Sequence, residues 1–151
     1  MLIVRSKDPI HFLSKKEKEK VVEAIREAEK HTSGEIRIHL VKTAEQNIFA
    51  QAKEIFKKIG MAQTKFRNGV LILLAVQDRR FVILGDQGIN EKVPEGFWDD
   101  MSGKMEGCFQ QDRFGEGLTE AILQTGDKLK HYFSFQRNDM NELPDEISYS
   151  R

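Results

Sequence analysis

Two apolar segments, separated by only four residues, constrain the fold of this chain more than any other feature. Residues 70–76 and 81–84 carry only apolar side chains. Strands that are apolar on both faces must be covered on both sides, so we expect both strands in the middle of the sheet of an α/β sandwich. Residues 77–80 are too few for a crossover connection, and the two strands should therefore run antiparallel.

A strand and a helix precede this pair. In residues 35–42, Ile36, Ile38 and Leu40 alternate with mostly polar residues, which predicts a strand with one polar face near a sheet edge. His39 lies on that polar face and is expected at the surface. Residues 44–59 have apolar side chains at helical spacing, and Gly60 ends the segment. A strand, a helix and a strand form a right-handed βαβ unit with parallel strands.

Helices account for most of the remaining chain. Ser14 and Glu17 form a capping box, which predicts a helix over residues 15–31. Pro94 suits the first turn of a helix, and further apolar stripes follow over residues 97–109 and 118–133. We therefore predict a three-layer α/β/α sandwich with a small mixed, mostly parallel sheet. It should span residues 14–134, between an N-terminal extension (1–13) and a loosely held polar tail (135–151).

Composition excludes several classes of function. The chain has 24 Lys and Arg residues and 24 Asp and Glu residues, so it lacks the excess positive charge that nucleic-acid binding requires. It has neither an apolar stretch long enough to span a membrane nor a signal peptide, so we expect no membrane insertion. The single cysteine, Cys108, excludes an internal disulfide and fits a reducing compartment, and we expect a cytoplasmic protein.

A candidate site lies where the strands end. Because the strand over 81–84 is antiparallel, Asp86 should lie at the same edge of the sheet as Glu35 and Asn68, with Asp78 at the opposite edge. Residues 86–116 contain eight acidic and three basic residues, a local net charge of −5. A solvated helix face and a site for a hard cation are both consistent with this charge.

The chain resembles the TPM domain family over residues 13–133. The resemblance rests on six short motifs: 32–36 (TSGEI), 68–71 (NGVL), 78–79 (DR), 85–89 (GDQGI), Pro94 and 112–118 (DRFGEGL). It implies an α/β/α sandwich with calcium or another divalent cation, such as Mg²⁺, in an acidic groove. Weak acid phosphatase activity is ascribed to some members of the family, and others resemble assembly or accessory factors.

Four carboxylates are candidate ligands for such a cation: Glu35, Asp86, Asp99 and Asp112. Each residue also has a purely structural interpretation. Glu35 suits an exposed charge at a strand start, and Asp86 suits a turn between glycines. Asp99 suits the first turn of a helix, and Asp112 suits an N-cap.

The known signatures of phosphatases are missing from the sequence. Cys108 and Arg113 are one residue too close for a thiol phosphatase loop, and the four histidines lack metal-ligand spacing. The favoured function is a calcium-binding interaction or accessory module, with a divalent cation and a protein as partners. The alternative is a weak metal-dependent phosphatase that uses Asp86 and Arg113 for catalysis, since a guanidinium grips phosphate bidentately. A plain oligomerising scaffold with an acidic face is a third interpretation.

Overall fold

The computed structural model describes residues 4–134 and 147–150. In chain order, its elements are α1 (Pro9–Phe12), α2 (Lys15–Glu29), β1 (Glu35–Val41), α3 (Ile48–Lys58), the 3₁₀ turn η1 (Met61–Gln63), β2 (Gly69–Ala75), β3 (Arg80–Gly85), α4 (Gln87–Asn90), α5 (Phe97–Gln110), α6 (Phe114–Tyr132) and β4 (Ser148–Tyr149). Among the described helices, none is both long and apolar enough to cross a membrane.

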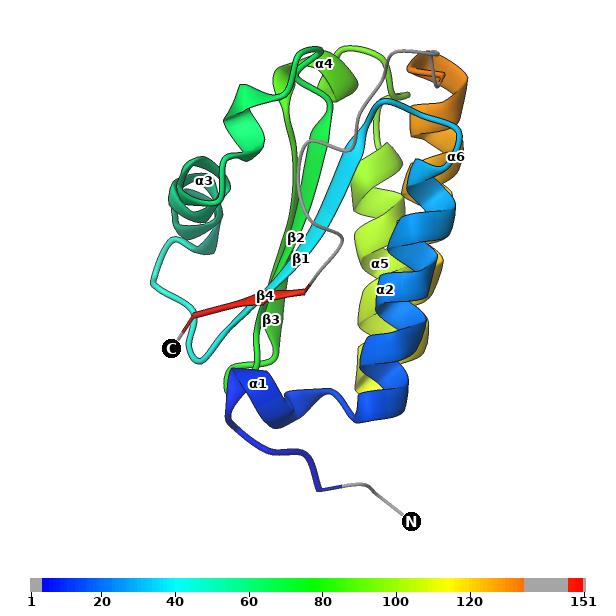
Figure 1. Ribbon diagram of the computed structural model, residues 1–151. Helices are drawn as coiled ribbons and strands as arrows, with labels where there is room; N and C mark the ends of the chain where they lie inside the picture. The colour runs from blue at the N-terminus through cyan, green and yellow to red at the C-terminus, as the bar shows by residue number, and fades with distance from the viewer. Residues whose placement is uncertain (1–3, 135–146, 151) are drawn as a thin grey trace.

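The elements form three layers. The four-stranded sheet lies in the middle, with α3 on one face and with α2, α5 and α6 on the other (Figure 1). Strands β1 and β2 are parallel, and β2 and β3 are antiparallel. The predicted α/β/α sandwich with a mixed, mostly parallel sheet is therefore confirmed.

Local capping sets the helix boundaries. The capping box of Ser14 and Glu17 is present, and it starts α2 as predicted. The helix predicted over residues 44–59 begins later, because the Asn47 side chain accepts a hydrogen bond from the Ala50 amide and caps α3 there. Pro94 precedes α5 instead of lying in its first turn, since the helix begins after Gly96, whose φ is 82°.

The strand order is β3-β2-β1-β4, which places β3 at an edge of the sheet. The expectation that β3 lies in the middle is therefore wrong. Its side chains are apolar because α5 and α3 cover its two faces, and they pack into the cores on both sides. Apolar residues on both faces of a strand indicate that other elements cover both faces. They do not indicate whether a further strand pairs with its edge.

At the other edge of the sheet, β1 and β4 also differ from the prediction. All seven residues of β1 are buried, including the polar set that was expected to face solvent. The short strand β4 pairs in parallel with β1 through Ser148 and Tyr149. The sequence predicted a tail here and no strand. Residues 135–146 of that tail lie outside the described residues.

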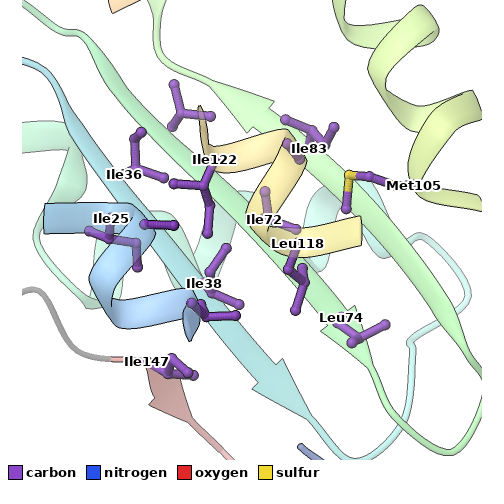
Figure 2. Packing of buried hydrophobic residues seen from close by; sticks show 14 of the residues in the cluster. Ile25, Ile36, Ile38, Ile72, Leu74, Ile83, Met105, Leu118, Ile122 and Ile147 are labelled. Atoms are coloured by element: carbon purple, nitrogen blue, oxygen red, sulfur yellow. The ribbon is translucent and has the colours of Figure 1, made fainter. Parts of the chain in front are cut away.

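The main core lies between the sheet and the three-helix layer. Figure 2 shows isoleucines and leucines of the strands meeting those of the helices. The labelled members are Ile36, Ile38, Ile72, Leu74 and Ile83 from the strands, Ile147 from the C-terminal segment, and Ile25, Met105, Leu118 and Ile122 from the helices. A smaller cluster under α3 includes Ala52, Phe56, Leu71, Leu73 and Leu84. Side chains of β3 thus pack into a core on both faces of the sheet, and its outer edge pairs with no strand among the described residues.

Candidate functional site

A groove of about 1000 Å³ runs along β3. Residues 79–85 of the hairpin and strand line it, together with the start of α3 on one side and α5 with its preceding loop on the other. The α3 side contributes Ile48 and the exposed ring of Phe49. The α5 side contributes three exposed acids, Glu95, Asp99 and Glu106. The α3 wall of the groove is thus apolar, and the α5 wall combines exposed acids with apolar and aromatic side chains such as Phe97 and Trp98.

Asp86 lies at the end of β3 and is engaged in an ion pair. Its two carboxylate oxygens accept hydrogen bonds from Nε and Nη2 of Arg67, at 2.7 and 2.9 Å. The same side chain caps α4 by accepting the Gln87 amide at 2.7 Å. The hydrogen bond to Asp86 raises the pKa of Arg67. Arg67 therefore already supplies the positive charge that a cation would bring to Asp86.

Sequence reasoning missed Arg67, although the hairpin register points to it. Gly69 lies opposite Asp86, and the Asp86 amide donates to the Gly69 carbonyl at 2.9 Å. Arg67, two residues before β2, is therefore close to Asp86, which directly follows β3. A second hollow of about 570 Å³ adjoins the groove at Gly85 and contains this ion pair, with Lys53 and Lys57 from α3.

Glu35 is buried at the start of β1, where an exposed charge or a cation ligand was expected. Its side chain lies 3.4 Å from Nη2 of Arg37, and Nη1 of Arg37 lies 3.5 Å from Glu29. Glu29 also accepts the Ile36 amide at 2.7 Å. These residues form a charge-compensated cluster inside the protein, which occupies the Glu35 carboxylate.

Asp112 belongs to a different cluster, at the other end of β3. Its carboxylate accepts a hydrogen bond from Nε of Arg5 at 3.0 Å and lies 3.6 Å from Nη1 of Arg79 in the β2–β3 hairpin. Arg5 also pairs with Glu17 at 2.6 Å and is almost completely buried. Burial lowers the pKa of Arg5, but the hydrogen bonds to Glu17 and Asp112 outweigh it and leave the pKa raised. This cluster fastens the N-terminal segment to the hairpin.

Asp99 alone among the four predicted ligands lines the groove and has no ion pair within the described part of the chain. It lies in the first turn of α5, whereas Asp112 follows that helix's last turn, about 20 Å away for a 14-residue helix. The four predicted ligands therefore do not form one site. Over residues 4–134 and 147–150, no group of three acidic, histidine or cysteine side chains is arranged to hold a metal ion.

Asp86 and Arg113, the predicted catalytic pair, are also far apart. Arg113 follows Asp112 and therefore lies near the hairpin end of β3, whereas Asp86 follows the other end of that strand. Figure 1 shows the hairpin beside α1 at one end of the sheet and α4, which Asp86 caps, at the other. The exposed Arg113 side chain lies 3.8 Å from Glu116. The side chains of Asp86 and Arg113 lie at opposite ends of β3, so they cannot act together on one phosphate.

His39 is buried, and the expectation of a surface position is wrong. Its Nδ1 lies 2.6 Å from the Ser148 hydroxyl, and its Nε2 lies 2.8 Å from the Ser150 hydroxyl. Burial lowers the pKa of His39 to about 4. Burial therefore keeps the ring neutral, and the hydroxyl groups of Ser148 and Ser150 give its two nitrogens hydrogen-bond partners at this buried place in β1.

Cys108 offers no activated nucleophile. Burial raises the pKa of its thiol, and the carboxylates of Glu120 and Glu116 raise it further. The thiolate is the reactive form of cysteine, so a raised pKa makes this side chain less reactive.

Comparisons with known proteins agree with this fold. The sequence model of the TPM domain matches residues 6–128. The chain is similar to the BA42 protein of the psychrophilic bacterium Bizionia argentinensis, with 45% sequence identity. The comparison with the NMR structure of BA42 gives a TM-score of 0.85. That match covers 93% of this chain and 97% of BA42. The fold also resembles the N-terminal domain of a protein from P. gingivalis, at 20% identity and a TM-score of 0.60 over 82% of this chain and 83% of that domain. No curated protein matches the chain.

Proposed function

The chain belongs to the TPM domain family, and we propose that it is an interaction module, which binds a protein partner and a divalent cation without catalysing a reaction. The groove along β3 is the observation that carries this proposal. It combines an open strand edge with one apolar wall and with one wall of exposed carboxylates that have no ion-pair partner within the described residues. A large concave surface of mixed apolar and polar character is the default place for a ligand.

A phosphatase is supported less well than a binding module. Phosphoryl transfer requires cations or preorganised donors around the charge that develops on the transferred group. In this groove the carboxylates of Glu95, Asp99 and Glu106 would repel a phosphate. The arginines that line it lie at the hairpin end, where Arg79 is close to Asp112 and Arg80 contacts the Glu45 carbonyl.

The resemblance to the family implies a divalent cation, and the acidic wall suggests where one could bind. Calcium prefers several oxygen ligands, including carboxylates and water. Glu95 and Asp99 flank the start of α5, and both are exposed at the groove. Asp86 would first have to release Arg67. Two carboxylates supplemented by water make a sparse ligand set, so we propose weak calcium binding at Glu95 and Asp99, with a dissociation constant of about 1 mM.

The experiment is a calcium titration followed through Trp98, which lines the groove and is the single tryptophan of the chain. We expect millimolar calcium to change its fluorescence in the wild type, and Asp99→Asn to abolish this change. Asp100→Asn is the matched control, since Asp100 is also exposed but does not line the groove. Identical titrations of the wild type and both variants would refute the cation site.

A phosphomonoester assay on the same samples tests the absence of catalysis. With calcium, magnesium or manganese, we expect no hydrolysis above that of the protein-free buffer. Metal-dependent hydrolysis that falls at least tenfold in both Asp86→Asn and Arg113→Ala would instead establish the phosphatase alternative.

A further inference from the structure

The outer edge of β3 has backbone groups without hydrogen-bond partners. Since Asp86 and Gly69 form a hydrogen-bonded pair, the alternating pattern of an antiparallel ladder turns the backbone of Val82 toward β2. The amide and carbonyl groups of Phe81 and Ile83 then face outward. Within the described part of the chain, neither residue has a partner for these groups. Unpaired edges of this kind are templates for an added strand.

These backbone groups face the groove, and its two walls suit the two faces of a strand. Phe81 and Ile83 pack on the α5 side of the sheet, and Val82 and Leu84 pack on the α3 side. A strand placed next to β3 at the usual spacing of about 4.8 Å would present alternate side chains to the same two sides. One set would meet the wall of α5, and the other would meet Ile48 and Phe49.

The charges on these walls indicate which side chains the added strand carries. Glu95, Asp99 and Glu106 are exposed on the α5 side and have no ion pairs among the described residues. The α3 side presents Ile48 and Phe49. Complementary charge therefore favours basic residues toward α5, and the apolar wall favours aliphatic residues toward α3.

A second copy of this chain fits the groove poorly. Its β3 would be the available edge strand, but it lies along a groove between the same two walls, which would meet before the strands reached pairing distance. In addition, residues 81–84 of that strand are apolar on both faces, so Arg80 at its first position is the one basic side chain that β3 offers to the acidic wall. A segment from another protein, without flanking walls, satisfies both requirements.

We propose that the groove binds an extended peptide segment of a partner protein, which adds to the sheet as a strand antiparallel to β3. Basic side chains of this segment face Asp99 and Glu106, and its apolar side chains face Phe49. The proposal rests on the proposed function, and it specifies the partner as an extended peptide with alternating basic and apolar residues.

The test uses the full chain and a fluorescein-labelled peptide of sequence Lys-Val-Lys-Val-Lys-Val, with binding followed by fluorescence anisotropy. In an antiparallel pair, residues directly opposite each other point to the same face, so the lysine backbones should bond to Phe81 and Ile83. N-methylation of the lysine amides should therefore weaken binding at least tenfold. N-methylation of the valine amides should change it less than twofold. An equal effect of both, or of neither, would overturn strand addition.

Charge provides the second arm of the test. The double variant Asp99→Lys/Glu106→Lys should weaken binding at least tenfold, whereas Asp100→Lys should leave it within twofold. A peptide Glu-Val-Glu-Val-Glu-Val that binds as tightly as the basic one would overturn the assignment of the acidic wall. The free wild-type chain could instead sediment as a dimer, and the Asp99→Lys/Glu106→Lys variant as a monomer. That result would identify a second copy of the chain as the occupant of the groove.

The two proposals fail in different ways. If calcium changes Trp98 fluorescence through Asp99 and the peptide does not bind, the proposed interaction module stands and the proposal of strand addition is wrong. If the chain hydrolyses phosphomonoesters through Asp86 and Arg113, the proposed function itself is wrong.

Discussion

Acidification should destabilise this protein through the buried side chain of His39. The ring is buried between β1 and the hydroxyl groups of Ser148 and Ser150. Burial lowers its pKa from 6.5 to about 4. Between these two values the unfolded chain binds a proton at His39 and the folded protein does not. The free energy of unfolding therefore falls as the pH falls through this window.

The size of the effect follows from the pKa difference. One pKa unit corresponds to about 1.4 kcal/mol, and the linkage relation integrates the difference over pH. For a folded pKa of about 4, the free energy of unfolding should fall from its value at pH 7.5 by about 1 kcal/mol at pH 5.5 and by about 2 kcal/mol at pH 5.

The assay is urea unfolding at several pH values between 7.5 and 5, for the wild type and for His39→Gln. Glutamine can still bond to both serines, but it cannot bind a proton in this range. The variant should therefore lose about 2 kcal/mol less than the wild type between pH 7.5 and pH 5. His31→Gln, at an exposed histidine, should keep the wild-type dependence. Parallel pH profiles for the wild type and His39→Gln would refute the argument.

Other substitutions test the packing around the site. Arg5→Ala should lower the free energy of unfolding by about 3 kcal/mol in urea melts, because it leaves the carboxylates of Glu17 and Asp112 without their buried partner. A loss below about 0.5 kcal/mol, typical of a surface pair, would contradict this. Gly88→Ala should cost about 3 kcal/mol, because its new Cβ would lie 2.1 Å from the Phe66 carbonyl oxygen. Gly103 lies in the middle of α5, and a Cβ added there would have no atom within 4 Å, so Gly103→Ala should instead raise the free energy of unfolding by about 0.5–1 kcal/mol. Equal melting temperatures for the two glycine variants would refute the packing argument.

Much of the fold could be predicted because periodicity and capping are local signals. Apolar spacing located the helices, and the four-residue hairpin fixed the direction of β3 relative to β2. The position of β3 at the sheet edge could not be predicted, because its apolar residues report coverage by α3 and α5 and carry no information about its outer neighbour. β4 was missed because two paired residues leave no periodic pattern.

The candidate site was predicted less well, because long-range partners decide what a carboxylate does. The sequence located Asp86 and Asp112 at strand and helix ends, but it did not show Arg67 beside the first or Arg5 beside the second. The hairpin register could have identified the Arg67 pair. The contact with Arg5 joins residues 107 positions apart, and no local pattern predicts it.

The most direct test of the central claim is amide hydrogen exchange along β3, measured by NMR on the full chain with and without the basic peptide. In the free protein, the outward amides of Phe81 and Ile83 should exchange faster than the inward amide of Val82, which is bonded to β2. Saturating peptide should slow Phe81 and Ile83 at least tenfold and leave Val82 unchanged. If Phe81 and Ile83 are already protected in the free protein, or remain unprotected with peptide bound, β3 is not the binding edge.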